Sequence, residues 1–477
     1  MDTKKLRQKI LDLAIHGKLV PQDPNDEPAS VLLERIRKEK EQLIKEGKIK
    51  APKKSKSAGD TSHYPKDVPF EVPEGWALST INDLFTINPK NIADDSLVAA
   101  FVPMASISDG FSDSFKYEER CWRDVKTGFT HFADSDVAVA KISPCLENRK
   151  SFVAKALPNG IGAGTTELFV FRSRHILPDY TLLFFKSDCF ISACVGTFNG
   201  VVGQQRAARN VIEEMMFPIP PVPEQSRIVE KVEELFGEID EIERGRLFVK
   251  ANIEAAKSRI LDLAIHGKLV PQYPSDEPAI ELLKRINPAF KPSDNLHYEG
   301  DFPNGWVSAS LGEVSNYGHC ISVPVEKIGN DDWVLELEDI EKDTGRILQR
   351  LSKKDRKISG IRHQFKKGQI LYSKLRTYLN KVLIADEDGF CTTEIIPITP
   401  INGVNALFLI IVLRSQYFLD YTQNCCYGVK MPRLGTNDAK KAVIPLPPFE
   451  EQGRIVAAVK GLFLTITQIG HVIENQE

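Results

Sequence analysis

The 477-residue chain lacks the features that define several large classes of protein. It has no run of about 18 uninterrupted apolar residues, the length that a membrane-spanning helix needs. Its first nine residues are too charged to begin a secretion signal. Its eight cysteines form no C-x-x-C pair, which favours free thiols over disulfides or a zinc site. We therefore expect a cytoplasmic protein that has no metal site and does not contact a membrane.

Catalytic motifs are also missing. The chain contains no G-x-x-x-x-G-K-[ST] phosphate loop, no Gly-rich dinucleotide turn and no H-E-x-x-H zinc motif. It also lacks the Asn/Asp-Pro-Pro-aromatic tetrapeptide and the Gly-rich cofactor loop of adenine methyltransferases; Asn88-Pro89-Lys90 is more simply a turn. His16 and His266 occupy equivalent helix ends, where an imidazole usually caps carbonyl groups. We predict a non-catalytic chain that binds no cofactor of its own.

A long apolar repeat occupies the centre of the chain. From Ile228 to Leu263, apolar residues recur in alternating steps of four and three, and only Arg246 interrupts them. A period of 3.5 over about five heptads predicts a helix that packs along another helix in a coiled coil. At 1.5 Å per residue, some forty residues would form a rod of roughly 60 Å. The predicted seam residues, which would contact the partner helix or a docked partner, are Ile228, Val232, Leu235, Ile239 and Ile242, with Ile455, Val459, Leu462 and Ile466 in a C-terminal copy.

Both ends of the chain repeat parts of this central region. Residues 10–22 are identical to residues 260–272, and residues 451–456 match residues 224–229. When both ends of the chain are aligned with the central region, the last residue of the chain falls immediately before the first. We therefore predict two copies of one unit, interrupted within a helix, whose termini meet and build a second rod antiparallel to the central one. Such an arrangement would have a pseudo-twofold axis.

The segments between the helices predict two globular domains. Each begins with a similar motif that ends in a tryptophan, Trp76 or Trp306, which we expect to be a core anchor. Short β-type runs then alternate with turn residues (136–140, 168–171, 369–372 and 381–385), and helical runs follow at 180–192 and 405–423. The pattern predicts a mixed α/β (α+β) domain of about 150 residues, present twice and separated by long helices. The expected division is 1–36 helical segment, 37–66 basic linker, 67–222 first domain, 223–290 long-helix region, 291–447 second domain and 448–477 C-terminal helix.

Basic residues are concentrated locally although the formal net charge is only −3. Residues 346–381 contain twelve Lys and Arg, a single acid (Asp355), and the interleaved aromatics Tyr372 and Tyr378. We favour a surface that follows DNA phosphates over a merely solvated face. Residues 37–66 carry ten basic and four acidic residues. There a solvated linker is the simpler interpretation, and an arm along phosphate is the alternative.

The two predicted domains also share short polar motifs. Lys141 aligns with Lys374, and residues 203–206 align with residues 430–433 just before each domain ends. Gln and Arg side chains can pair bidentately with adenine and guanine edges. The repeated Thr-Thr-Glu at 165–167 and 392–394 is equally compatible with a structural cap and with a base contact. The predicted DNA-binding residues are Lys141, Arg149, Lys150, Gln204, Gln205, Arg206, Arg362, Lys374, Arg376, Tyr378, Lys381, Lys430 and Arg433.

These repeats carry a resemblance to a known family. Pro-Pro-x-x-Glu-Gln-x-Arg-Ile-Val begins at residues 220 and 447, and Ala-Ile-x-Gly-Lys-Leu-Val-Pro-Gln begins at residues 14 and 264. Over essentially its whole length, the chain resembles the specificity subunit of type I restriction–modification systems. The resemblance implies two target-recognition domains, each recognising one half of a bipartite site in double-stranded DNA. It also implies that the helices dock two modification subunits, which bring S-adenosylmethionine and methylate adenine. Where such a system has restriction subunits, those would bring ATP and Mg²⁺.

An alternative from another class is a coiled-coil scaffold whose globular halves bind peptides or proteins. The basic stretch at 346–381 argues against it. Only a DNA-binding protein would lose affinity for duplex DNA steeply with salt, so a titration at two salt concentrations separates the two hypotheses.

Overall fold

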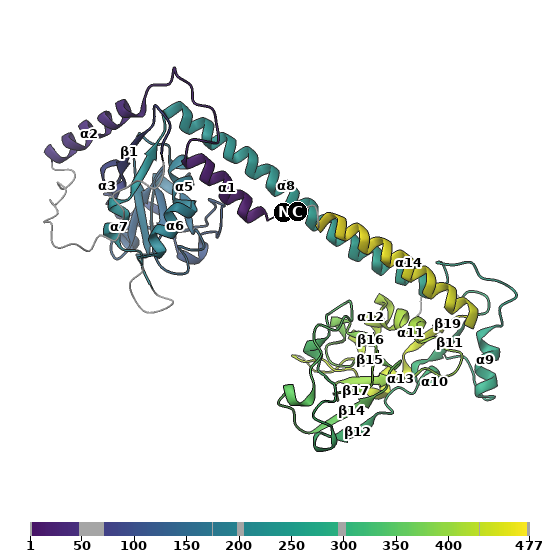
Figure 1. The fold of residues 1–477 in the computed structure, drawn as a ribbon. Coiled ribbons are helices and arrows are strands. Elements are labelled where there is room, and N and C mark those ends of the chain that lie inside the picture. Colours follow the sequence, from purple (N-terminus) through teal and green to yellow (C-terminus); the bar gives the residue numbers. More distant parts are fainter. Residues whose placement is uncertain are drawn as a thin grey trace. The chain divides into compact units, whose positions relative to one another are not determined.

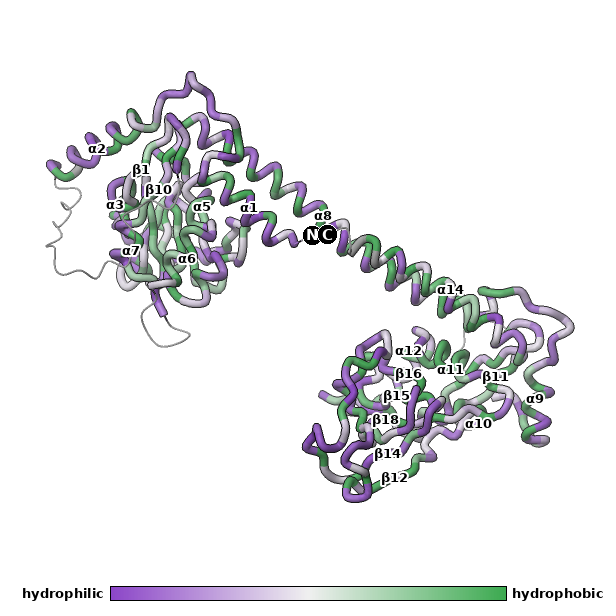
Figure 2. Tube along the Cα trace, viewed as in Figure 1, coloured by the Kyte–Doolittle hydropathy of each residue, from purple (hydrophilic) through white to green (hydrophobic). Residues whose placement is uncertain are grey.

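The computed structural model describes residues 2–46, 71–173, 175–197, 205–293, 302–428 and 430–474. They fall into two units, Met1–Arg244 (unit 1) and Gly245–Glu477 (unit 2) (Figure 1). The boundary lies within the 44-residue helix α8 (Val222–Ile265), which confirms the predicted long central helix. Hydrophobic and hydrophilic residues alternate along α8, as expected of a helix with one buried side (Figure 2).

In unit 1, helix α1 (Thr3–Ile15) packs antiparallel to the first part of α8. Arg7, near the start of α1, forms an ion pair of 3.0 Å with Glu243, whereas Gln22, beyond the end of α1, donates to Glu224. Of the predicted seam residues, Ile228, Val232 and Ile239 are buried and Leu235 is partly buried against the same core. Ile242 is 41% exposed and is not buried in the helix pair; its predicted contact with a docked partner stays a prediction. This level of the helix pair is polar because Arg7 pairs with both Asp240 and Glu243.

In unit 2, helix α14 (Phe449–Glu474) packs antiparallel to the second part of α8. Gly470 lies against Ile253, and Glu451 accepts a hydrogen bond from Gln272, just beyond the end of α8. Ile455 and Val459 are buried and Ile466 is partly buried, as predicted, but Leu462 is 41% exposed. Each unit therefore contains an antiparallel helix pair. Whether the two termini meet depends on how one unit is placed relative to the other. Their meeting stays a prediction.

The α/β domain of unit 1 joins two four-stranded sheets, β2-β9-β6-β7 and β4-β3-β8-β5, to a two-stranded ribbon, β1-β10. The ribbon pairs Ala77 with Ile219, so the beginning and the end of the domain lie side by side next to α8. The strands are β1 (Ala77–Thr80), β2 (Thr86–Ile87), β3 (Val98–Val102), β4 (Glu118–Cys121), β5 (Thr130–Ala133), β6 (Val137–Ala140), β7 (Ser151–Val153), β8 (Ile161–Gly164), β9 (Leu168–Arg172) and β10 (Met216–Ile219). The helices of this domain are α3 (Ile81–Leu84), α4 (Trp122–Val125), α5 (Pro178–Lys186), α6 (Asp188–Val195) and α7 (Arg209–Glu214).

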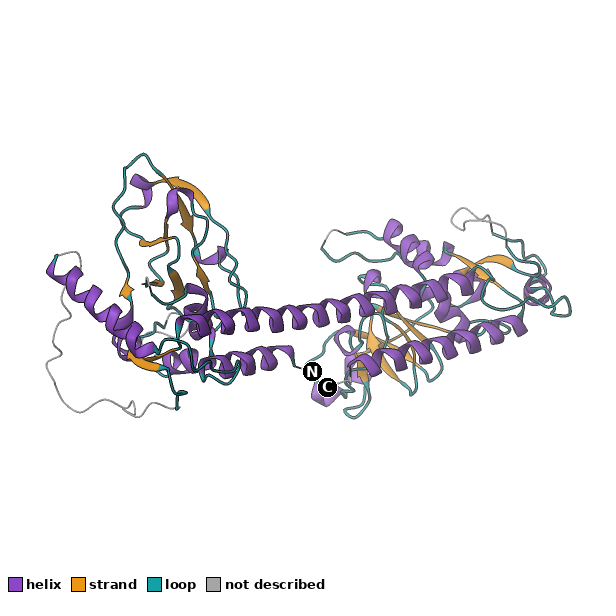
Figure 3. Cartoon of the chain, turned by 90° about the horizontal axis from the view of Figure 1, so that it is seen from above, coloured by secondary structure: helices purple, strands orange, loops and turns teal. Residues whose placement is uncertain are grey.

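The α/β domain of unit 2 has the same plan. A ribbon pairs Val307 with Leu446, and two sheets have the orders β16-β15-β18 and β12-β14-β17-β13. The strands are β11 (Val307–Ser310), β12 (Ile321–Pro324), β13 (Val334–Leu335), β14 (Ile361–Phe365), β15 (Ile370–Ser373), β16 (Val382–Ile384), β17 (Gly389–Thr392), β18 (Ile395–Ile398) and β19 (Val443–Leu446). Helix α9 (Ala279–Ile286) precedes this domain, whose helices are α10 (Leu311–Val314), α11 (Ala406–Arg414), α12 (Gln416–Cys425) and α13 (Thr436–Lys441). In both units the strands belong to the α/β domain (Figure 3).

The predicted strands at 136–140, 168–171, 369–372 and 381–385 are confirmed as β6, β9, β15 and β16. Each predicted helical run proves to be two helices, because Ser187 and Ser415 end one helix and accept a backbone N–H at the start of the next. Helix α2 (Ala29–Lys45) is longer than the expected helix ending near Ile36, so the basic segment begins as helix. The rest of that segment, from residue 47 to 66, lies outside the described residues, as do residues 67–70 of the predicted first domain.

The predicted core tryptophans, the cysteines and the two helix-end histidines all lie in the described residues. Trp76 and Trp306 are both buried, as predicted for core anchors, and all eight cysteines are free thiols. The imidazoles of His16 and His266 contact the carbonyls of Asp12 and Asp262 at their helix ends, which confirms the capping interpretation. None of the described helices is long and apolar enough to cross a membrane, and the described side chains include no group of His, Cys, Asp and Glu placed to hold a metal ion.

Candidate nucleic-acid interface

In unit 1, the structure brings together three motifs that the sequence separates. Lys141 follows strand β6, Glu167 precedes strand β9, and Arg206 lies in the loop before α7. The Lys141 N–H donates to the Glu167 carbonyl at 2.9 Å, and a bridge pairs Ile142 with Arg206. The Arg206 guanidinium donates twice to the Glu167 carboxylate, at 2.7 and 2.8 Å. Lys141, Glu167 and Arg206 form what we term the unit 1 cluster.

Unit 2 contains the same arrangement on equivalent elements. Lys374 follows β15, Glu394 precedes β18, and Arg433 lies in the loop before α13. The Lys374 N–H donates to the Glu394 carbonyl at 3.0 Å, and a bridge pairs Leu375 with Arg433. Arg433 donates to Glu394 through Nε only, at 3.1 and 3.2 Å from the two carboxylate oxygens. Lys374, Glu394 and Arg433 form the unit 2 cluster.

The electrostatics of the unit 1 cluster are those of a compact charged group. The hydrogen bond from Arg206 lowers the pKa of the Glu167 carboxyl, so Glu167 is ionised and holds the guanidinium in place. Burial lowers the pKa of Lys141, Glu167 opposes that shift, and Arg206 adds to it. The Lys141 ammonium also lies 5.2 Å from the centre of the Phe169 ring. The side chain of Arg206 is 48% exposed, so this cluster is accessible from solvent.

The unit 2 cluster has an exposed aromatic and basic border. Tyr427 exchanges two backbone hydrogen bonds with Arg433, and its side chain is 61% exposed. A short turn at Thr377–Leu379 presents Tyr378, which is 48% exposed, and this turn is tied to the same loop by an Arg376 N–H bond of 2.7 Å to Pro432. Lys430 is exposed as well. Exposed tyrosines beside cations can stack on bases and contact phosphates.

The turn at Thr377–Leu379 is also strained. The residues on either side of it, Arg376 and Asn380, adopt φ values of 50° and 49°. A non-glycine residue in this left-handed region costs on the order of 1–3 kcal/mol and persists where the surroundings impose it, often at binding sites. The strain therefore supports placing Arg376 and Tyr378 at a functional surface.

The repeated Thr-Thr-Glu motif has a structural role in both units. Thr165 accepts the N–H of Glu167 at 3.2 Å, and Thr392 accepts the N–H of Glu394 at 3.5 Å. These bonds shape the turn that presents each glutamate. Of the two interpretations left open by the sequence, the structure supplies contacts for the cap.

Arg149 and Lys150 were predicted to bind DNA, and the structure places them elsewhere. The Arg149 side chain is 7% exposed, pairs with Asp188 and donates to the Lys186 carbonyl at 2.9 Å. Lys150 donates to the Ile107 carbonyl at 2.7 Å and is 14% exposed. Both cations stabilise the interior of the unit 1 domain. The prediction was wrong because a sequence motif does not show that a charge is buried with its partner.

Half of the basic residues in the stretch at 346–381 are neutralised by acids from outside it. In the described residues, Arg346, Arg350, Lys354, Arg356, Arg362 and Lys366 all form ion pairs with carboxylates. Arg362 pairs with Glu336 at 3.0 Å and its side chain is 14% exposed, while Lys381 donates to the Leu337 carbonyl at 2.6 Å. Counting charges within a window overlooks carboxylates that the fold brings from elsewhere. As a continuous phosphate-binding surface the stretch is not supported, although Lys374, Arg376 and Tyr378 remain near the unit 2 cluster.

Of the two predicted glutamines, only one lies in the described residues. Gln205 is half-buried beside the unit 1 cluster, and its carbonyl accepts the Ser143 N–H at 2.8 Å. Gln204 lies outside the described residues. Sequence reasoning missed Glu167 and Glu394 as members of the clusters, and their repetition at the same place in both domains was the signal that could have found them.

Comparisons with known proteins show which family the chain belongs to. The model of the type I restriction modification DNA specificity domain matches residues 303–476. The EcoAI specificity subunit of Escherichia coli is 34% identical over 99% of this chain and 91% of that protein, and the EcoEI specificity subunit of Escherichia coli is 32% identical over the same shares. The chain belongs to the type I restriction enzyme specificity subunits. It is therefore the DNA-specificity component of a restriction–modification complex and not its catalyst.

The fold agrees with this family. A chain solved in a study of assembly and conformational transition of the type I R-M system has a TM-score of 0.60, with 19% identity, over 86% of this chain and 95% of that chain. At this identity the match supports the architecture alone. It agrees with the mixed α/β domains and the long helix of this specificity subunit.

Proposed function

We propose that this specificity subunit recognises a bipartite sequence in double-stranded DNA, one half-site with each unit. The observation that carries the proposal is that the same Lys–Glu–Arg cluster occurs once in each α/β domain, on equivalent strands and loops. The neighbours of the two clusters differ: Gln205 precedes Arg206, whereas Pro432 precedes Arg433. A shared framework with different side chains suits two unlike half-sites.

The arginines are the residues best placed to contact base edges or phosphates. Glu394 holds Arg433 through Nε, and the two terminal nitrogens of Arg433 have no partner among the described residues. Those nitrogens can face the O6 and N7 acceptors of guanine or a phosphate. Lys141 and Lys374 lie beside the arginines, where an ammonium group would contribute a phosphate contact that is independent of sequence.

Two modification subunits are the proposed protein partners, with the helical regions as their docking surfaces. Leu247 and Phe248 on α8 are each 70% exposed, and Leu464 and Val472 on α14 are 62% and 61% exposed. Large apolar side chains at such exposure support a protein contact. The modification subunits would bring S-adenosylmethionine, and restriction subunits, where present, would bring ATP and Mg²⁺. This chain would bind none of these cofactors and would act in the cytoplasm.

Two measurements test this function. Sequencing of methylated adenines in cells that carry the chain and its modification subunits should reveal one motif with two defined halves and an undefined spacer. A continuous motif would contradict recognition by two units. Titration of the complex with duplex DNA at two salt concentrations addresses the scaffold alternative, which family membership already disfavours. A protein scaffold would not bind duplex DNA with an affinity that falls steeply as the salt concentration rises.

A further inference from the structure

A glutamate is buried at the start of one long helix in each unit. Glu224 in α8 and Glu451 in α14 are 1% and 0% exposed. Removing a carboxylate from water is costly unless hydrogen bonds satisfy it. Neither glutamate contacts the clusters described above, so their contacts call for a separate explanation.

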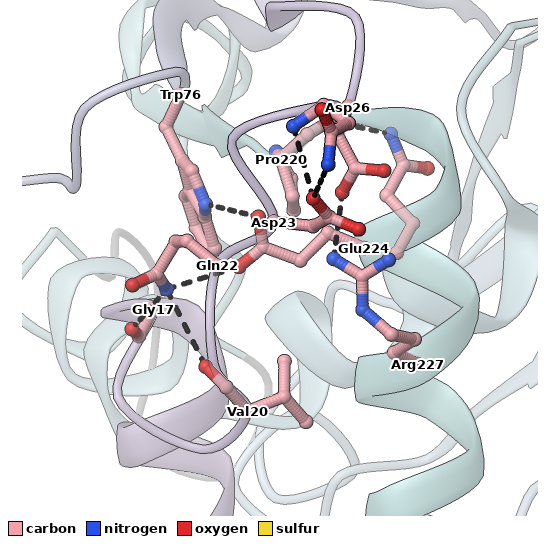
Figure 4. A network of polar contacts seen from close by, with 11 residues as sticks. Gly17, Val20, Gln22, Asp23, Asp26, Trp76, Pro220, Glu224 and Arg227 are labelled. Atoms are coloured by element: carbon pink, nitrogen blue, oxygen red, sulfur yellow. Dashed lines mark hydrogen bonds and ion pairs between the residues drawn. The ribbon is translucent and has the colours of Figure 1, made fainter.

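In unit 1, Glu224 joins three parts of the structure (Figure 4). Its Oε1 accepts a hydrogen bond of 3.1 Å from Gln22, in the loop between α1 and α2. Its Oε2 accepts a hydrogen bond of 3.0 Å from the Trp76 indole, at the beginning of the α/β domain. One side chain of α8 thus fastens both the α1–α2 loop and the domain to the helix.

The residues beside Glu224 strengthen the same junction. Gln225 is fully buried, and its Oε1 accepts the Leu177 N–H at 2.9 Å, at the start of helix α5 of the domain. Arg227 pairs with Asp26 of the α1–α2 loop at 2.6 Å. The α8 helix therefore binds the loop twice and the domain twice within four residues.

The loop also packs tightly against the domain. Gly17 has a φ of +65°, and a side-chain carbon at this position would lie 2.3 Å from Cγ of Pro73. Gly267 repeats both features, with a φ of +61° and a distance of 2.4 Å to Pro303. Only glycine allows this approach without displacing the proline.

Unit 2 repeats the junction with its own residues. Gln272 donates to Glu451 at 3.1 Å, Gln452 accepts the Asn405 N–H at 2.7 Å, and Arg454 pairs with Asp276. Burial raises the pKa of the Glu451 carboxyl, and the hydrogen bond from Gln272 and the nearby Trp306 indole oppose that shift. The Trp306 N–H and Oε2 of Glu451 do not form a hydrogen bond like that between Trp76 and Glu224.

We propose that Glu224 and Glu451 are positioning residues: each, together with the Gln that follows it, holds the α/β domain of its own unit on the helices in the orientation that sequence-specific DNA recognition requires. This inference rests on the proposed function. In unit 1 the role demands a carboxylate, because two N–H donors from different segments face its two oxygens. A glutamine of the same size would present an NH₂ group to one of those donors.

The test uses the full chain in complex with its modification subunits. Glu224→Gln and Glu451→Gln are compared on duplexes that carry single-base changes in one half-site at a time. Glu224→Gln should reduce discrimination at one half-site by about tenfold, which corresponds to about 1.4 kcal/mol, and leave the other half-site unchanged. Glu451→Gln should affect the opposite half-site. The salt dependence of binding should not change, since no phosphate contact is removed.

Two further variants keep the test decisive. Trp76→Phe keeps an aromatic ring but removes the N–H donor and the bulk of the second ring, so it should weaken discrimination at the same half-site as Glu224→Gln even if the latter does not fold. Glu230→Gln, at an exposed position farther along α8, is the matched control and should change nothing.

The outcomes separate the inference from the function on which it rests. Equal loss at both half-sites, or unchanged discrimination in folded Glu224→Gln and Trp76→Phe, would overturn the positioning role alone. A wild-type complex that does not discriminate at two half-sites would overturn the proposed function itself.

Discussion

The two units use one framework to present different surfaces. Apart from the Trp76–Glu224 hydrogen bond, the Glu–Gln–Arg motif at the start of α8 and of α14 makes matching contacts in both units, and the backbone bonds of the two clusters match as well. The arginines differ: Arg206 engages Glu167 with two nitrogens, whereas Arg433 engages Glu394 through Nε alone. Unit 2 also has Tyr378 and Tyr427 exposed near its cluster. Contacts that recur in both units hold the scaffold, and those that differ are the candidates for sequence recognition.

The largest effect is expected from removing the arginine of either cluster. Arg433→Ala should relax specificity in one half-site by roughly 10- to 100-fold, as expected for a base contact worth about 1–3 kcal/mol. Arg206→Ala should relax the other half-site. Binding of the purified complex to duplexes with single-base changes measures both effects.

Arg346→Ala is the control for the arginine variants, because this residue is exposed and paired with Glu341 outside the cluster. If Arg346→Ala costs as much as Arg433→Ala, the basic stretch rather than the cluster contacts DNA. The arginines of the two clusters would then not be the residues that recognise the half-sites.

A smaller effect is expected from the aromatic border of unit 2. Tyr378→Ala should weaken DNA binding by several-fold to tenfold if the ring stacks on a base, because stacking on one exposed ring should lie at the low end of the about 1–3 kcal/mol found for a stacked base. Tyr378→Phe keeps the ring and should bind almost as well as the wild type. Fluorescence anisotropy with a labelled duplex measures both. Equal losses in the two variants would assign the contact to the hydroxyl group.

Lys374 should contribute mainly through charge. Lys374→Ala should lower the affinity for all sequences alike and reduce the log–log salt slope by about 0.9, the value for one phosphate contact. Lys354→Ala is the control, because this exposed lysine pairs with Asp331. An unchanged slope in Lys374→Ala would place its ammonium group away from the DNA backbone.

The effect that is farthest from DNA recognition concerns stability in unit 1. Burial lowers the pKa of Lys186 to about 7, and its ammonium donates to the carbonyls of Gly110 and Arg149. Because the unfolded lysine keeps its usual pKa of about 10.4, the unfolded chain binds more protons between about pH 7 and pH 10. The free energy of unfolding of unit 1 therefore rises with pH through this window. Near pH 7 the cost of burying the charged Lys186 is fully present.

Lys186→Met should flatten this pH dependence. Hydrogen exchange of the unit 1 core at pH 7 and pH 9 checks it, after correction for the intrinsic exchange rate. A variant whose stability changes with pH as steeply as the wild type would show that another group is responsible.

The sequence predicted the elements that depend on local periodicity. Apolar residues at heptad spacing identified α8 and its buried positions Ile228, Val232 and Ile239, because a helix that packs along another must bury one side. The paired tryptophans and the strands β6, β9, β15 and β16 followed from similarly local patterns.

Contacts between distant segments could not be predicted in this way. Arg149 and Arg362 proved to be internal because Asp188 and Glu336, far away in the chain, pair with them. The Glu224 junction depends on Gln22 and Trp76, neither of which stands near it in sequence. The repeats signalled that these residues matter, but only the fold shows which side chains meet.

An exchange of one α/β domain tests whether each unit recognises its own half-site independently. Residues 71–219 would be replaced by the corresponding domain of a relative, keeping Glu224 and the rest of α8, and methylated sites would be sequenced in cells that carry the modification subunits. If each unit recognises its own half-site, the new motif has one half-site with new letters and the other unchanged. A motif altered in both halves, or in neither, would contradict recognition by two independent units.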